Sequence, residues 1–421
     1  MRTFYPEQLR IRHRRRGAVY LAVLAVCLIV ITLGIGGILA ARVQARASDG
    51  GGDMAEARLA ALSGMELARF WMAQDPNWRT TRGNGNWTTN LPTGNGATVS
   101  IDLADPIDGD LTNHPHDPVT VTTTGQKGQA RQVLQVTLSA RPVPLAVLRF
   151  ALHTGGLLRV DSPYRIRVGS ATASTNGQLR NDSTIEGNAV CQSLISSGIV
   201  CGTLQTGVAP RPLPDSSVPE TYASLGTLIN PGTTTIDGQV LAPGRNPWGT
   251  PDPDGVYVIR SSSDLTIRNT RINGTLVIIA PSNTVTIDSQ VFFHPARADY
   301  PTLIVNGSVN LNYTSSGNSL SEATTGINFN PPDAPYNGFG DADLADSYPS
   351  EIWGLVHITG QINVSRPGII RGAMICESQF RAQNADLQVV YDPALYTNPP
   401  QYYTTGVQMV PLAGSFKQIV N

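Results

Sequence analysis

Charge is scarce in this sequence, and lysine is almost absent. Charged residues make up 14% of the 421 residues, the formal net charge is -1, and Lys127 and Lys417 are its two lysines. Outside residues 1–16 the arginines are spread along the chain and do not form the basic patch that marks a nucleic-acid partner. We therefore expect no nucleic-acid partner.

Catalytic and nucleotide-binding motifs of well-defined spacing are also absent. The chain contains no G-x-x-x-x-G-K-[ST], no H-E-x-x-H, no C-x-x-C and no G-x-S-x-G. The first absence excludes a P-loop ATPase, and the others leave the zinc-protease, thiol-redox and serine-hydrolase classes without support. We expect a protein that is not an enzyme and that needs no cofactor.

Cysteine is rare, with four in the whole chain. Cys27 and Cys376 lie within apolar runs and read as small buried or membrane-embedded side chains. Cys191 and Cys201 share one loop-like stretch and could form a disulfide in an oxidising compartment. The sequence leaves open whether this pair is bonded.

One long apolar run dominates the N-terminal part of the chain. Residues 17–41 contain no charged side chain, and as a helix they would cross the roughly 30 Å hydrocarbon core of a bilayer. A cleaved signal peptide would have a shorter apolar core of roughly 7–15 residues. Residues 1–16 form a basic leader, so the positive-inside rule places the remaining chain outside the inner membrane of a bacterium. We predict a single-pass anchor with a cytoplasmic N-terminus.

The next segment predicts a small α+β domain at residues 53–142. The glycines at 50–52 suggest a flexible break, and a helix is expected from residue 53 to residue 74. Its apolar stripe recurs at helical spacing and consists of Ala61, Met65, Ala68 and Met72. Alternating residues then predict three antiparallel strands, near 99–103, 119–122 and 133–138.

The pattern of apolar and polar residues changes again from residue 145 to residue 421. Short apolar strands occur in pairs separated by a polar turn, such as 303–305 followed by 309–311, and the pairs recur about every 18 to 27 residues. Stacking such units into coils buries one continuous core. We therefore predict a mainly β chain whose C-terminal domain is a right-handed parallel β-helix, with a β-sandwich as the alternative. A loop-like insertion at 314–350 interrupts the repeats.

Two groups of side chains have the chemistry of a metal site. In the insertion, Asp341, Asp343 and Asp346 are weak candidates for calcium ligands or for an acid/base pair, against the simpler reading of solvated loop charges. In a proline-rich stretch, His114 and His116 could share one face and bind a metal, against the simpler reading of a solvated turn.

Three arginines in the repeat region could bind an anionic surface glycan. Arg260, Arg268 and Arg271 occur close together in sequence, although exposed arginines also serve solubility alone. We retain a surface glycan as a candidate partner of the C-terminal domain.

The first part of the chain, about residues 10–74, resembles the pilin-like proteins of type IV pili and type II secretion systems. The resemblance rests on Arg14-Arg15-Arg16-Gly17, on the apolar helix that begins at Ala18, and on the extension from Ala55 to Ala68. It implies that a prepilin peptidase cuts after Gly17 and methylates Ala18, and that the helix contacts other pilin-like or membrane subunits. Ala22 replaces the glutamate that most pilins carry at the fifth mature position, as in PilX-type and GspK-type minor members.

These observations give one main functional hypothesis and two alternatives. The main one is a pilin-like envelope protein that displays a β-helix outside the inner membrane. The first alternative is a membrane-tethered carbohydrate-active β-helix, either a lyase or a hydrolase. The second is a self-assembling cytoskeletal solenoid, which would place the repeats in the cytoplasm.

Overall fold

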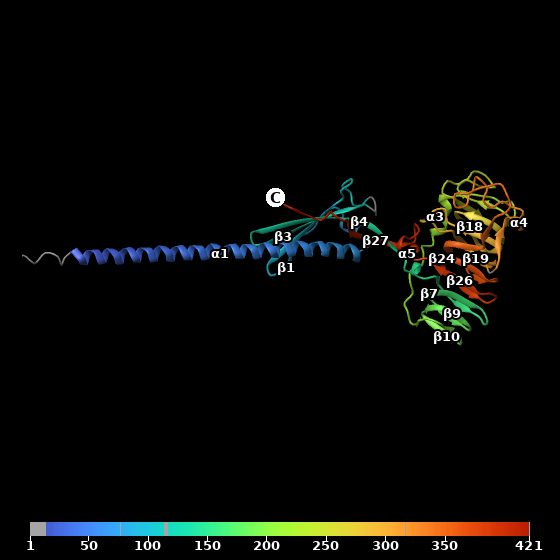
Figure 1. The fold of residues 1–421 in the computed structure, drawn as a ribbon, viewed down its shortest axis with the longest axis horizontal. Helices are drawn as coiled ribbons and strands as arrows, with labels where there is room; N and C mark the ends of the chain where they lie inside the picture. Colours follow the sequence, from blue (N-terminus) through green and yellow to red (C-terminus); the bar gives the residue numbers. More distant parts are fainter. Residues whose placement is uncertain (1–13, 76, 113–116, 316, 421) are drawn as a thin grey trace, which may run out of the picture. The chain divides into compact units, whose positions relative to one another are not determined.

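The computed structural model describes residues 14–75, 77–112, 117–315 and 317–420. The chain divides into two compact units: unit 1 comprises Met1–Arg141 and Val407–Asn421, and unit 2 comprises Pro142–Gly406. Strands predominate, and one long helix lies at the N-terminal end of the described chain (Figure 1). The prediction of a mainly β chain with an N-terminal helix is confirmed.

Helix α1 (Arg14–Gln74) is continuous. The prediction of a flexible break at 50–52 and of a new helix start at residue 53 was therefore wrong. Each glycine costs a helix only about 1 kcal/mol relative to alanine, and long helix-forming segments flank the three glycines on both sides. The helix ends at Gln74, where the sequence Asp75-Pro76 predicts its end.

Unit 1 pairs the second half of α1 with an antiparallel sheet. The sheet order is β1-β2-β3-β4-β27, and β28 also pairs with β4. The elements are α2 (Trp78–Arg82), β1 (Gly85–Gly94), β2 (Ala97–Ala104), β3 (Val119–Lys127), β4 (Ala130–Pro144), β27 (Thr404–Pro411) and β28 (Lys417–Ile419). The three predicted strands correspond to β2, β3 and β4, whereas β1, β27 and β28 were not predicted.

The predicted apolar stripe of α1 packs on this sheet. Ala61, Met65, Ala68 and Met72 are all buried together with side chains of β2, β3 and β4. The helix lies so close to β3 that a Cβ atom on Gly125 would stand 1.9 Å from the carbonyl oxygen of Ala57. A side chain at this glycine is therefore incompatible with the packing.

Unit 2 consists mainly of short strands in one 20-stranded sheet, and every described pairing in that sheet is parallel. A β-sandwich would require antiparallel pairing, so the alternative prediction does not fit. The strands are β5 (Leu152–Thr154), β6 (Leu158–Val160), β7 (Arg165–Thr175), β8 (Gln178–Asn181), β9 (Thr184–Val190), β10 (Ser193–Ser196), β11 (Ile199–Val200), β12 (Leu204–Gln205), β13 (Thr227–Leu228), β14 (Thr235–Asp237), β15 (Val240–Leu241), β16 (Val256–Arg260), β17 (Leu265–Asn273), β18 (Thr275–His294), β19 (Leu303–Tyr313), β22 (Glu351–Ile358), β23 (Ile362–Val364), β24 (Gly368–Cys376), β25 (Phe380–Ala382) and β26 (Leu387–Tyr391). The remaining elements are η1 (Ala146–Arg149), α3 (Val218–Leu225), β20 (Ser319–Ser321), α4 (Glu322–Thr325), β21 (Ser347–Pro349) and α5 (Ala394–Thr397).

The core of unit 2 is built from columns of aligned apolar residues. Strand register places equivalent residues of successive coils side by side, at the 4.7–4.9 Å spacing of paired strands. One such column contains Tyr257, Leu276, Leu303, Val356, Met374, Leu152 and Ala173. All seven are fully or almost fully buried, so each coil depends on its neighbours for its core.

The chain does not run from one end of this stack to the other. It begins in the middle with β5, proceeds to β12 at one end, passes through α3 to β13 at the other end, and returns through β16 to β26. The last coils then pair with the first, because β24 pairs with β5 and β26 pairs with β7. In Figure 1 the red β26 accordingly lies beside the green β7.

This topology makes unit 2 an insertion into unit 1. The two ends of unit 2 lie together, where the backbone N–H of Leu145 donates to the carbonyl oxygen of Tyr403 at 3.0 Å. The chain leaves unit 1 after β4 and returns in β27, the neighbour of β4 in the same sheet. The predicted boundary of 145–421 was therefore wrong at its C-terminal end. Short polar strands that pair with a segment far away in sequence leave no local pattern to recognise.

Candidate functional site

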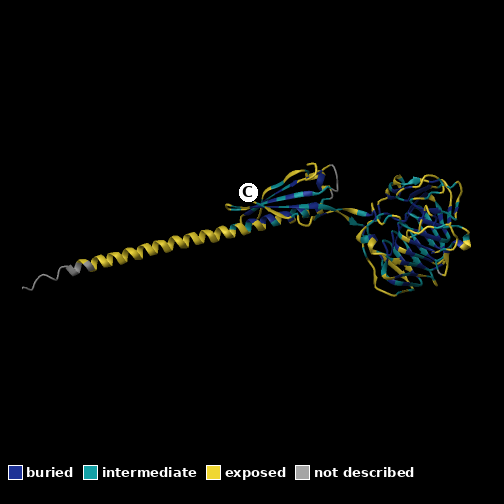
Figure 2. Cartoon of the chain, turned by 45° about the horizontal axis from the view of Figure 1, so that its top comes forward, coloured by how far each residue is buried: buried dark blue, intermediate teal, exposed yellow. Residues whose placement is uncertain are grey.

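The exposed apolar half of α1 is the first candidate site. Every residue from 19 to 52 is exposed, whereas buried positions begin at Ala57 (Figure 2). Residues 19–41 carry no charge, and this part of the helix is long and apolar enough to cross a membrane. An exposed apolar surface of this size marks a membrane or protein interaction site.

The few polar groups in this segment are compatible with an apolar environment. The Thr32 hydroxyl donates to the carbonyl oxygens of Leu28 and Ile29, at 2.9 Å in both cases. Such bonds to the preceding turn satisfy a hydroxyl without water. Gly36 and Gly37 have open space where a Cβ would stand, so another helix could approach them closely.

The predicted processing residues lie at the start of the same helix. Gly17 and Ala18 both belong to α1. Gly17 is exposed, and nothing lies within 4 Å of the position that its Cβ would occupy. Cleavage between them remains a prediction from the resemblance.

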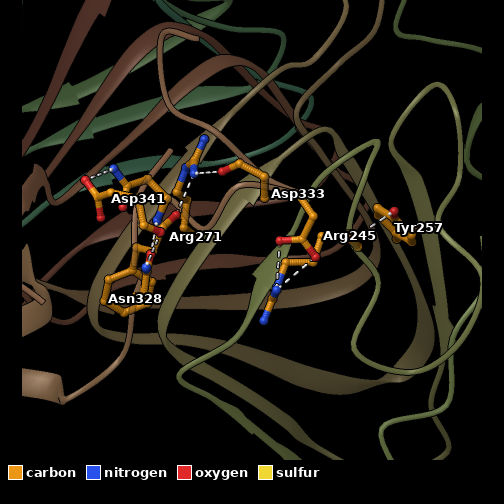
Figure 3. A network of polar contacts seen from close by, with 9 residues as sticks. Arg245, Tyr257, Arg271, Asn328, Asp333 and Asp341 are labelled. Atoms are coloured by element: carbon orange, nitrogen blue, oxygen red, sulfur yellow. Dashed lines mark hydrogen bonds and ion pairs between the residues drawn. The ribbon is translucent and has the colours of Figure 1, made fainter. Parts of the chain in front are cut away.

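In unit 2, the insertion at 314–350 folds over a buried arginine (Figure 3). The Arg271 guanidinium donates to the carbonyl oxygens of Phe329, Ala334 and Pro335 at 2.5, 2.7 and 2.9 Å. The side chain is fully buried, and burial lowers the pKa of Arg271. Its guanidinium also lies 5.3 Å from the ring centre of Tyr336. Arg271 therefore fixes the insertion to β17 and is not available to a ligand.

The three aspartates of the insertion have structural partners. Asp346 accepts a hydrogen bond from the Asn330 amide at 2.8 Å. Asp341 accepts one from the backbone N–H of Asp343 at 3.2 Å, and the Asp343 carboxylate accepts one from the backbone N–H of Ala345 at 2.9 Å. The buried Glu322 carboxylate binds the backbone N–H groups of Phe329 and Asp346. Among the described residues, these three aspartates do not form a group close enough to hold one metal ion. The calcium prediction for them has no geometric support.

An acidic group that the sequence analysis missed lies in the loop between β2 and β3. Asp105, Asp108 and Asp117 each have a ligand atom within 4.8 Å of the others. The buried Arg79 is close by, donating to the carbonyl oxygens of Leu111 and Asp117, and it offsets part of the negative charge. The sequence signal for this group was the D-x-x-D spacing of Asp105 and Asp108, just before the histidine-rich stretch. His114 and His116 lie outside the described residues.

The possible disulfide between Cys191 and Cys201 does not form in the structure, and both cysteines are free. Ile199 and Val200 pair with Thr184 and Ile185, which places Cys201 beside the following residue of β9. That residue is Glu186, and Cys191 lies five residues after it along the coil. At about 3.3 Å per extended residue, the two cysteines are far apart along the strand direction. This separation exceeds the Cα distance of roughly 7 Å that a disulfide spans.

The predicted arginine patch is also not present. Arg260 forms an ion pair with Glu220 at 2.6 Å, and Arg268 forms one with Asp237 at 2.8 Å. Arg271 is buried as described above, so these arginines offer no common surface to an anionic glycan.

Three histidines, the buried His153 and His357 and the half-buried His294, have packing roles within unit 2. Burial lowers the pKa of His153 to about 3, with a further contribution from Arg211, and burial followed by Arg271 lowers that of His294 to about 4. His357 bonds to the Tyr403 hydroxyl at 2.9 Å and to the Glu377 carboxylate at 2.8 Å. His153 and His357 are completely buried, which places them out of reach of a substrate.

Comparisons with known proteins give distant structural likenesses. No family model matches the chain, and no curated protein matches it by sequence. The chain is similar to the crystal structure of the competence-associated pilin ComZ from Thermus thermophilus, with a TM-score of 0.29 and 12% identity over 87% of this chain and 97% of that one. It is also similar to a glycosylated ice-binding protein from an Arctic yeast, with a TM-score of 0.31 and 13% identity over 60% of this chain and 96% of that one. An ice-binding domain of Shewanella frigidimarina gives a TM-score of 0.28 and 11% identity over 59% of this chain and 98% of that one. These scores and identities are too low to establish a shared fold or function.

Proposed function

We propose that this chain is a pilin-like protein of the bacterial cell envelope, anchored in the inner membrane by α1. In this proposal it is a minor component of a type IV pilus or type II secretion-like assembly. Unit 2 is a β-helix displayed on the periplasmic or extracellular side, and it acts by binding or spacing and not by catalysis.

The observation that carries the proposal is the division of α1 into two halves. Residues 19–41 of the helix are apolar and exposed, and its second half packs on an antiparallel sheet. The first half needs lipid or the helices of neighbouring subunits to remove its apolar surface from water. The arginines of the leader, confined to one end of the apolar run, favour a cytoplasmic N-terminus.

The insertion of unit 2 between β4 and β27 supports the display role. Both ends of unit 2 lie together. The chain can therefore leave β4, form unit 2 and return to the neighbouring strand β27 without a change in the pairing of these two strands. Domain insertion is tolerated where chain ends are close and exposed.

Mass spectrometry of the mature N-terminus tests the pilin part of the proposal. We expect the chain purified from cells that contain a prepilin peptidase to begin at a methylated Ala18. A Gly17→Val variant should keep the leader, whereas the control Gly34→Ala should be processed normally. An intact Met1 in the unmodified chain from such cells would contradict the proposal.

Protease digestion of intact spheroplasts tests the orientation. Unit 2 should be digested from outside, with the leader protected. A protected unit 2 would instead support the cytoskeletal alternative.

A further inference from the structure

A groove crosses successive coils of unit 2 beside α5. It consists of two hollows of about 410 and 720 Å³ that adjoin at Val390 and Tyr391. One wall is the segment that follows β26 and includes Asp392 and Leu395. The floor comes from outward-facing positions of the coils, whose inward-facing residues form the core.

Strand register shows how far the groove extends. Trp353, Arg371 and Val390 are aligned on β22, β24 and β26. In the neighbouring column Gln388 is followed by Arg167 on β7 and Glu186 on β9. β24, β26, β7 and β9 follow one another in Figure 1. Five coils at the spacing of paired strands span about 19 Å, which suits a short chain better than a single small molecule.

Trp353 is a large aromatic side chain that remains 38% exposed at one end of this floor. Its indole N–H donates to the Glu351 carboxylate at 2.9 Å, and its ring meets Phe292 edge-on at 5.9 Å. These contacts fix the ring before any ligand arrives, which lowers the entropic cost of binding. A fixed, partly exposed aromatic ring offers an apolar surface to the C–H face of a sugar ring.

Two arginines along the groove are already paired with carboxylates, and a third, Arg149, donates to the Tyr396 hydroxyl. Arg371 donates to the Glu351 carboxylate at 2.9 Å, and Arg167 contacts Asp386 at 2.9 Å and Glu186 at 3.2 Å. Such pairs present fixed donors and acceptors while the local net charge stays small. A polyanion would have to compete with these carboxylates, whereas a neutral polar ligand would not.

Two amides beside these pairs have open hydrogen-bonding capacity. In the part of the chain that the structure describes, no hydrogen bond is found for the side-chain amides of Gln388 and Asn398. Both residues line the groove, and each amide can donate to one hydroxyl and accept from another.

We infer that this groove binds a neutral oligosaccharide, with one sugar ring stacked on Trp353 and hydroxyl groups bound by Gln388 and Asn398. The inference goes beyond the proposed function and does not depend on assembly into a pilus. It concerns recognition only, because no bond of the sugar is broken.

Isothermal titration calorimetry on the full chain in lipid nanodiscs tests this inference. The probes are cellohexaose, maltohexaose and chitohexaose, with a hexamer of galacturonic acid as the anionic comparison. We expect at least one neutral probe to bind with a Kd near or below about 1 mM, and more tightly than the anionic one. Trp353→Ala should weaken that binding about tenfold or more, and Gln388→Ala should weaken it to a smaller extent.

The matched control is Phe339→Ala, because Phe339 is 79% exposed and does not line the groove. It should leave binding unchanged. If Trp353→Ala alters the melting curve of unit 2, Trp353→Phe provides the second test, and it should retain part of the affinity because a stacking face remains. No binding of any neutral probe, tighter binding of the galacturonic acid hexamer, or equal binding by both Trp353 variants and the unmodified chain would overturn the inference. None of these results would alter the N-terminal processing that tests the proposed function.

Discussion

The exposed half of α1 and the inner columns of unit 2 are similarly apolar, but they differ in whether the chain itself removes their apolar surface from water. Residues 19–43 are exposed along their whole length, whereas the aligned apolar residues of unit 2 are buried by the coils on either side. Hydrophobic residues in unit 2 therefore stabilise the chain's own fold. Those of α1 contribute stability only when another apolar environment covers them.

Deletion of residues 17–43 should have the largest effect, because it removes the exposed apolar segment and leaves the buried columns of unit 2 intact. If α1 anchors the chain as proposed, the shortened chain should leave the membrane fraction entirely, because the exposed apolar surface of residues 19–41 is gone. Unit 2 should retain its thermal unfolding transition, since none of its core comes from these residues. Carbonate extraction of membranes followed by immunoblotting measures the first effect, and a shortened chain that stays in the pellet would contradict the anchor role of α1.

Arg271→Leu should have the largest effect inside unit 2. The change leaves the carbonyl oxygens of Phe329, Ala334 and Pro335 without their donor, and we expect a loss of about 3–5 kcal/mol. Proteolysis in increasing urea, with fragments identified by mass spectrometry, should show the 314–350 segment cleaved at lower urea. Membrane association should not change.

Arg245→Ala is the matched control for this substitution. Arg245 forms a partly exposed ion pair with Asp333 at 2.9 Å (Figure 3), and exposed pairs of this kind contribute about 0.2–1 kcal/mol. Equal losses in the two variants would show that Arg271 does not hold the insertion.

His153 should make the stability of unit 2 depend on pH. Its folded-state pKa is lowered to about 3 by burial, and an unfolded histidine titrates near 6.5. Between these values the unfolded chain binds the extra proton, so stability falls as pH falls from about 6.5 towards 3, by up to about 1.4 kcal/mol per pH unit.

The variant His153→Gln should lose this contribution. We expect the difference in unfolding free energy between pH 7 and pH 5 to shrink by about 2 kcal/mol relative to the unmodified chain. Urea unfolding at the two pH values measures it. An unchanged difference would show that His153 is not the group responsible.

Local sequence patterns predicted the parts of this molecule that depend on neighbouring residues. The apolar run at 17–41, the stripe from Ala61 to Met72 and the paired strands of unit 2 all follow from hydrophobic periodicity. The pairing of β26 with β7 and of β28 with β4 joins segments that are distant in sequence, and periodicity carries no information about such partners. The burial of Arg271 was missed for a related reason. Its hydrogen-bond acceptors are backbone carbonyl groups, which every residue has, so no residue type in the sequence marks them.

The glycines at 50–52 provide the smallest and most specific test, because they lie where the exposed half of α1 passes into the packed half. In a continuous helix with open space around Gly51, Gly51→Ala should stabilise the local helix by about 0.5–1 kcal/mol. Amide hydrogen exchange of the peptide around residues 48–56 should slow accordingly. The matched glycine is Gly125, where the added Cβ would stand 1.9 Å from the Ala57 carbonyl oxygen, so Gly125→Ala should instead speed exchange in the packed half. If Gly51→Ala left exchange unchanged or faster, the two halves of α1 would be separate helices joined by a flexible segment. The exposed half would then transmit no orientation to the sheet that the other half covers.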